Sequence, residues 1–63
     1  MILDYDRSAD ILYIIHAHAK PYPEADDAHR FKDFFIRYKE GEIIGITVIN
    51  ATAHFPKSFL KTL

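Results

Sequence analysis

The chain has 63 residues and a formal net charge of −1, and it contains no cysteine. A chain this short buries only about 60% of the surface that its unfolded form exposes, yet 49% of its residues are hydrophobic and 14% are aromatic. The missing cysteines exclude disulfides and thiolate metal sites. We expect a single domain over residues 1–63 that hides its surplus apolar surface in a homodimer or a larger homo-oligomer.

The distribution of charged and apolar residues argues against two classes of partner, nucleic acids and membranes. No basic stripe of the kind that binds nucleic acid is visible, which argues against a nucleic-acid partner. No apolar run approaches the roughly 18 residues of a membrane span, so no membrane partner is expected. The N-terminus lacks a basic segment followed by a long apolar stretch, which predicts a cytoplasmic protein rather than a secreted one.

The first half of the chain has the pattern of a β-hairpin. Residues 2–5 form a short strand candidate, and residues 6–9 have turn chemistry because Asp6 can accept a hydrogen bond from a backbone N–H two residues on. Residues 11–17 carry apolar side chains on both faces, which predicts a central strand. A helix over residues 9–17 is the alternative, and β-branched crowding argues against it.

The second half is predicted as a loop followed by a second hairpin. Residues 19–30 contain two prolines and several acidic residues, which predicts a loop. Residues 31–38 and 43–49 then have strand composition, and Gly41 between them occupies a turn position that needs a positive φ. Together with a short helix after Pro56, the pattern predicts an α+β fold: a four-stranded antiparallel meander of two hairpins with a C-terminal helix.

The turn at Glu40-Gly41 decides which side chains share a face. A two-residue loop would put Arg37 on the face of the later isoleucines, whereas a three-residue loop with a glycine bulge pairs Tyr38 with Glu42. We prefer the three-residue loop, because it gathers an apolar set on one face: Phe34, Ile36, Ile44, Ile46 and Val48. It also sets Phe35 opposite Gly45. The other face is mixed, as in an oligomer interface, with Phe35, Arg37, Ile43, Thr47 and Ile49.

The tail and the apolar strands supply candidate interface residues. Phe55, Phe59 and Leu63 recur every four residues, and a helix this short needs packing to persist, so we expect Phe59 and Leu63 to be buried. The interface candidates come from both strands and tail: Tyr13, Phe35, Ile43, Phe59 and Leu63.

Two sets of side chains could carry chemistry. His16 and His18 would project from one strand face and could share a zinc or nickel ion, with a third ligand from Asp26, Asp27, His29 or His54. No HExxH spacing accompanies them, and a solvated strand end explains them as well. Asp6 and Asp10 could form an acid–base pair, but such residues more often cap turns. Gly41 and Gly45 read as a turn glycine and a crowded-strand glycine. We expect no cofactor.

A family resemblance rests on two short motifs. Tyr5-Asp6, Ala9-Asp10 and Leu12-Tyr13-Ile14, followed by Gly41 and Gly45-Ile46, resemble the family of small proteins of unknown function called DUF2283. Thr47 stands where that family usually has Glu. The resemblance implies paired hairpins, no assigned activity, and an antitoxin-like role against a small toxin-like protein. We therefore expect a non-enzymatic protein–protein interaction domain, with a metal-binding or hydrolytic protein that uses His16 and His18 as the alternative.

Overall fold

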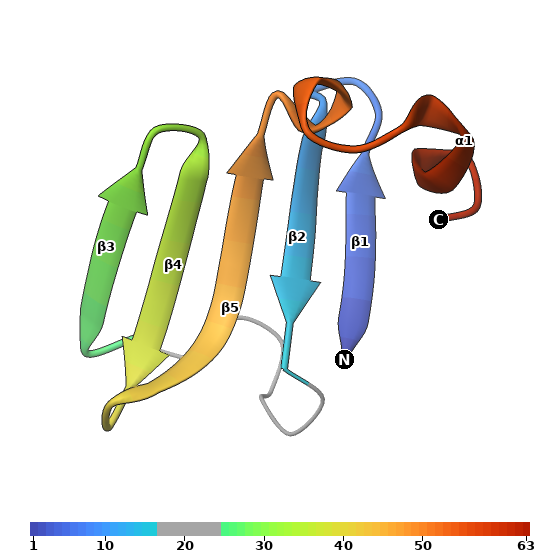
Figure 1. Cartoon of the computed structure of the whole chain (residues 1–63). Coiled ribbons are helices and arrows are strands. Elements are labelled where there is room, and N and C mark those ends of the chain that lie inside the picture. The colour runs from blue at the N-terminus through green and yellow to red at the C-terminus, as the bar shows by residue number, and fades with distance from the viewer. Residues whose placement is uncertain (17–24) are drawn as a thin grey trace.

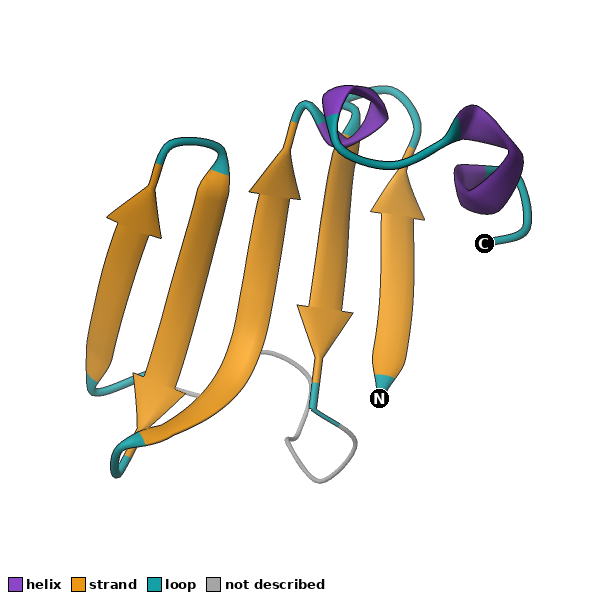
Figure 2. Cartoon of the chain, viewed as in Figure 1, coloured by secondary structure: helices purple, strands orange, loops and turns teal. Residues whose placement is uncertain are grey.

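A computed structural model describes residues 1–16 and 25–63, and these form one antiparallel sheet followed by two short helical turns (Figure 1). The five strands are β1 (Ile2–Asp6), β2 (Ile11–Ile15), β3 (Asp27–Phe31), β4 (Phe34–Lys39) and β5 (Glu42–Ile49). The 3₁₀ turn η1 (Ala51–Ala53) and the helix α1 (Lys57–Leu60) complete the chain (Figure 2). The strand order across the sheet is β1-β2-β5-β4-β3.

The expected α+β fold with four strands is wrong, because the sheet has five strands and little helix. The segment predicted as the end of a loop contains β3, and the strand expected over residues 31–38 is interrupted by a tight turn at Lys32 and Asp33. Lys32 takes a positive φ of 53°, and the turn pairs Phe31 with Phe34. The acidic residues suggested a loop, but Asp33 favours a reversal between two phenylalanines that can then pair across strands.

The expected meander order is also wrong, since β2 pairs with β5 and not with the next strand along the chain. The register sets Leu12 directly opposite Val48. These two side chains are 1% and 0% exposed, so placing β5 at the centre buries them both. Burial of the best apolar pair, rather than sequence order, therefore accounts for the arrangement.

One face of the sheet carries the core. Leu12 and Val48 pack with Ala51 and Leu60, which come from η1 and α1, so both helical elements lie on this face. We call it the covered face. Neither helical element in the described part of the chain has the length and apolarity to cross a membrane.

The tail is anchored by a residue other than those expected. Leu60 is 2% exposed, whereas Phe59 and Leu63 are 38% and 37% exposed, so their expected burial within the chain is wrong. A spacing of four residues assumes a regular helix, but α1 has only four residues and is preceded by an extended Pro56. The short turn therefore directs Leu60 toward the sheet.

The β4–β5 connection is a two-residue loop, not the three-residue loop that we preferred. Glu40 and Gly41 have φ angles of 51° and 80°, and Lys39 pairs with Glu42. A bulge then shifts the register, so that Phe35 lies opposite Thr47, and Gly45 lies opposite Arg37. The added residue restores the alternation of faces. The result keeps four apolar residues on one face: Phe34, Ile36, Ile46 and Val48.

Candidate interaction surface

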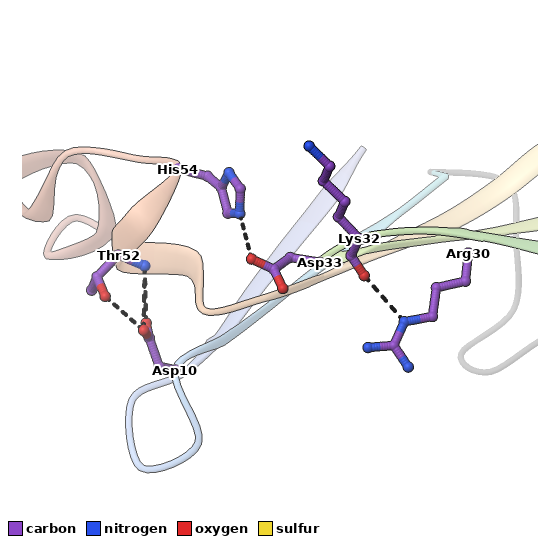
Figure 3. A network of polar contacts seen from close by, with 6 residues as sticks. All are labelled: Asp10, Arg30, Lys32, Asp33, Thr52 and His54. Carbon is purple, nitrogen blue, oxygen red and sulfur yellow. Dashed lines mark hydrogen bonds and ion pairs between the residues drawn. The ribbon is translucent and has the colours of Figure 1, made fainter.

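Asp10 ties the β1–β2 loop to the segment that follows β5. Its carboxylate accepts hydrogen bonds from Thr52 through the hydroxyl at 2.6 Å and the backbone amide at 3.1 Å (Figure 3). The hydroxyl of Tyr5 donates a further bond at 2.7 Å. The Asp10 carbonyl oxygen also accepts the backbone amide of Ala51 at 3.0 Å. The positive φ of Asp10, 55°, is thus fixed by contacts on both its side chain and its backbone.

These bonds set the ionisation of the groups involved. The hydroxyls of Thr52 and then Tyr5 stabilise the carboxylate, which holds the pKa of Asp10 below its ordinary value. The same contact with Asp10 raises the pKa of Tyr5. A carboxylate that already accepts three donors is a poor proton acceptor for a substrate.

Asp6 is engaged in a similar way within the β1–β2 loop. Its carboxylate accepts the Ser8 hydroxyl at 2.7 Å, the Ser8 amide at 3.0 Å and the Ala9 amide at 3.3 Å. The Ser8 hydroxyl, followed by the Ala9 amide, lowers the pKa of Asp6. The two aspartates of the first motif thus have different hydrogen-bond partners. Asp6 stabilises the turn itself, whereas Asp10 binds the segment that follows β5.

A second polar contact holds the same segment at the other half of the sheet. His54 lies 2.9 Å from Asp33 in the β3–β4 turn (Figure 3). Its ring also meets that of Phe34 edge to face, with 4.8 Å between the ring centroids. The segment after β5 therefore contacts both the β1–β2 loop and the β3–β4 turn, which lie at the same end of the strands. Thr52 was not among the sequence-derived candidates, and His54 was named only as a possible third ligand of a metal ion. No local signal identifies them, because their partners are 42 and 21 positions away.

The opposite face of the sheet carries no described helix or loop, and we call it the open face. Its central row crosses all five strands in the order Asp4, Tyr13, Thr47, Phe35, Arg30. The neighbouring rows add mainly apolar side chains: Ile2, Ile11, Ile15 and Ile49. None of these belongs to the buried core, and Ile2 and Phe35 are 49% and 38% exposed. An apolar surface of this kind on one side of a small sheet is typical of a protein-binding site.

Gly45 makes a shallow hollow at the middle of the open face. The hollow has a volume of about 60 Å³, and its lining includes Tyr13, Ile15, Arg37 and Thr47. A Cβ on Gly45 would meet the Ile14 carbonyl oxygen at 3.6 Å, which is ordinary van der Waals contact. The crowding expected at Gly45 is therefore absent among the described residues. Packing within the described part of the chain does not explain why this position lacks a side chain.

The five interface candidates predicted from the sequence do not lie on one surface of the structure. Tyr13 and Phe35 share the central row of the open face. Ile43 instead pairs with Tyr38 beside the bulge and lines a hollow with Ile14 and Ile46, which pack against the core. Phe59 and Leu63 belong to the tail, which is anchored on the covered face.

The histidines lie in separate surroundings. His16 is exposed just beyond β2, and its amide donates to the Ile44 carbonyl at 3.1 Å. His18 lies outside the described residues, so the proposed pair is not tested. His29 contacts Asp27 at 3.3 Å, while His54 contacts Asp33. Across residues 1–16 and 25–63, no group of three histidines or carboxylates is arranged to hold a metal ion.

Comparison with known proteins places the chain in a family. A model of the proteins of unknown function called DUF2283 matches residues 2–51, which include all five strands and both aspartates of the first motif. Thr52 and His54 lie just beyond the matched range. No curated protein and no solved structure matches the chain significantly. Because the match covers most of the 63 residues, the chain belongs to the DUF2283 family.

Proposed function

We propose that this protein is a non-enzymatic, self-associating interaction domain, and that the open face is its binding surface. The observation that carries the proposal is the asymmetry of the sheet. Both helical elements pack on the covered face, while the isoleucines and aromatic residues of the open face lie outside the core cluster. Apolar surface left in water favours association, because its burial is the main driving force for binding.

The absence of an enzymatic role is part of the proposal and rests on two features. Asp6 and Asp10, the carboxylates of the family motif, are engaged by neighbouring donors. The hollow between the β1–β2 loop and α1 is also small, with a volume of about 210 Å³ and a lining that includes Tyr5, Arg7 and Lys57. Small-molecule sites usually occupy about 300–1,000 Å³.

An antitoxin-like role would be one cellular use of such a surface. It rests on the family resemblance, and it requires a small toxin-like protein encoded beside this one. Sequencing the neighbouring genes tests it, because an antitoxin without an adjacent toxin gene would contradict the role. Self-association through the open face does not depend on that outcome.

Sedimentation tests the proposed surface directly. As its concentration is raised from micromolar to millimolar, the unaltered protein is expected to reach at least the mass of a dimer. Phe35→Glu places a charge on the open face and is expected to give a folded monomer. Phe31→Glu is the matched control, because Phe31 lies on the neighbouring edge strand and faces the other side of the sheet, where it is 67% exposed. An unaltered protein that stays monomeric, or equal effects of the two substitutions, would contradict the proposal.

A further inference from the structure

We propose that the occupant of the open face is a second copy of the chain, related by a two-fold axis that runs parallel to the strands above β5. In this arrangement β1 of one protomer lies over β3 of its partner. The inference rests on the proposed function, and it adds the identity of the partner and the orientation in which it binds.

The charges of the central row carry the argument. Asp4 ends the row on the outer strand β1, and Arg30 ends it on the outer strand β3. Between them lie only Tyr13, Thr47 and Phe35. The Asp4 carboxylate has no hydrogen bond or ion pair to any described residue, and Arg30 donates through Nε to the carbonyl of Lys32 at 3.1 Å (Figure 3). The central row is therefore acidic at one edge and basic at the other, with two aromatic residues and a threonine between them, and Arg37 on β4 adds a second basic side chain in the neighbouring row.

This pattern distinguishes between the two ways in which the face can meet its own copy. Face-to-face sheets pack with their strands aligned to within about 30°. A two-fold axis perpendicular to the strands would set Asp4 against Asp4 of the partner, and Arg30 against Arg30. An axis parallel to the strands reverses the row, so that Asp4 of each protomer meets Arg30 of the other. Opposite charges at facing positions fix the register of an interface and exclude the alternative with like charges.

The same axis gives the centre of the row suitable partners. Tyr13 of each protomer lies over Phe35 of the other, which permits aromatic contact at two equivalent positions. Gly45 and Thr47, both on β5, lie on the axis and meet their own counterparts. The missing side chain at Gly45 allows close approach there, with the hollow beside it open to the partner. Self-pairing thus explains a glycine that the isolated fold does not require.

The size of the face predicts a weak dimer. Five strands about 4.8 Å apart and about 17 Å long present roughly 400 Å² per protomer. The total of roughly 800 Å² is below the roughly 1,200–2,000 Å² of stable interfaces and within the range of weak, transient ones, so we expect dissociation in the micromolar range or weaker.

Charge exchange between Asp4 and Arg30 tests the orientation. Asp4→Lys and Arg30→Glu are each expected to weaken self-association roughly tenfold, measured by sedimentation equilibrium, because each creates two like-charge contacts in the dimer. The double variant Asp4→Lys/Arg30→Glu is expected to recover association, since every contact is again between opposite charges. An axis perpendicular to the strands would leave like charges facing in the double variant, so failure to recover would overturn the proposal.

The outcomes of these experiments distinguish failure of the proposed orientation from failure of the proposed function. Phe35→Glu that abolishes association while the charge variants have no effect would leave the interaction surface intact and overturn the orientation alone. An unaltered protein that is monomeric throughout would overturn both. Thermal unfolding of each variant checks that a lost dimer does not reflect a lost fold.

Cross-linking supplies evidence that does not depend on charge. The chain has no cysteine, so single cysteines can be introduced cleanly. Ile2 and Ala28 end the row that passes through Gly45. Mixed Ile2→Cys and Ala28→Cys chains are expected to be joined by a short bis-maleimide, while each chain alone gives little product. Preferential linking of Ile2→Cys chains to each other would overturn the proposed axis.

Discussion

Thr52 donates two hydrogen bonds to the carboxylate of Asp10, a residue 42 positions earlier in the chain. This contact connects the loop between the first two strands to the turn that follows the last strand. The second aspartate of the family motif therefore holds the segment after β5 over the sheet. His54 makes a similar contact with Asp33, so one short segment joins the β1–β2 loop and the β3–β4 turn at one end of the strands. These polar contacts, together with the buried side chain of Leu60, hold the two helical elements against the covered face.

Thr52→Val should destabilise the protein while keeping the shape of the side chain. The change removes the 2.6 Å hydroxyl bond to Asp10 and leaves the backbone bond. We expect a loss of about 1 kcal/mol in the free energy of unfolding, which corresponds to about 4–8 °C in Tm for a domain of this size. Thr52→Ser is the control, because it keeps the hydroxyl. If serine and valine lower the Tm equally, the hydroxyl bond does not contribute.

The stability of the protein should fall at both ends of the pH range. The pKa of Asp10 in the folded protein lies below its ordinary value of 3.8, so its contribution is present above about pH 4 and is lost as the pH falls through the lowered pKa. Tyr5 has a pKa raised above 10.0, so its contribution is present below pH 10 and is lost as the pH rises through the raised value.

The variant Asp10→Asn tests how much the contact between Asp10 and Tyr5 contributes to the pH dependence of the stability. It is expected to flatten the decline in Tm at low pH and also the part of the alkaline decline that belongs to Tyr5. The part of the acid decline due to Asp6 should persist, because the pKa of Asp6 is lowered by separate donors. Parallel Tm profiles for the variant and the unaltered protein would show that the Asp10 contacts make no pH-dependent contribution.

The β4–β5 loop should respond to backbone preference alone. Gly41 has a φ of +80°, and no atom lies within 4 Å of the position that its Cβ would take. Gly41→Val is therefore expected to cost about 1–2 kcal/mol through left-handed strain, whereas Gly41→Asn should cost much less. Glu40 has a φ of 51°, so Glu40→Asn should stabilise the turn by a few tenths of a kcal/mol or more. Chemical denaturation measures all three, and equal effects of valine and asparagine at Gly41 would contradict the assignment.

Leu60 and Leu63 form a matched pair in the tail. Leu60 is 2% exposed and belongs to the core, whereas Leu63 is 37% exposed. Leu60→Ala should cost about 2–5 kcal/mol, which is a large share of the stability of so small a domain. Leu63→Ala should have a much smaller effect on the monomer. Thermal unfolding at low protein concentration compares them, and an equal loss would show that α1 is not held by Leu60.

The local features of the fold could be predicted from the sequence, while its long-range pairing could not. The strand character of residues 11–15, the turn at Asp6 and the positive φ of Gly41 all follow from nearby residues. The pairing of β2 with β5 depends on the burial of Leu12 against Val48, which neither strand encodes by itself.

Errors in the predicted fold and site have specific physical causes. The acidic residues before β3 favoured a loop, but hydrogen bonds along β4 and the turn at Lys32 and Asp33 outweighed them. Tyr13 and Phe35 were named as interface candidates from the predicted strands and the faces on which their side chains lie. Their place in one row that ends in Asp4 and Arg30 required the register, because a shift of one residue would have moved each to the other face.

The alternative use of the chain as a metal protein has a direct test. His16 and His18 supply at most two ligands, and tight zinc sites use three or four. In the described part of the chain, His29 and His54 each lie beside a different aspartate, so neither is arranged to complete a site with His16. We expect no stoichiometric metal in protein purified without an affinity tag, and no rise in Tm with zinc or nickel that His16→Ala/His18→Ala removes. Close to one bound metal per chain, lost in that double variant, would make the metal-binding function the better explanation. A small fraction of nickel would not, because an exposed histidine pair acquires it from a column.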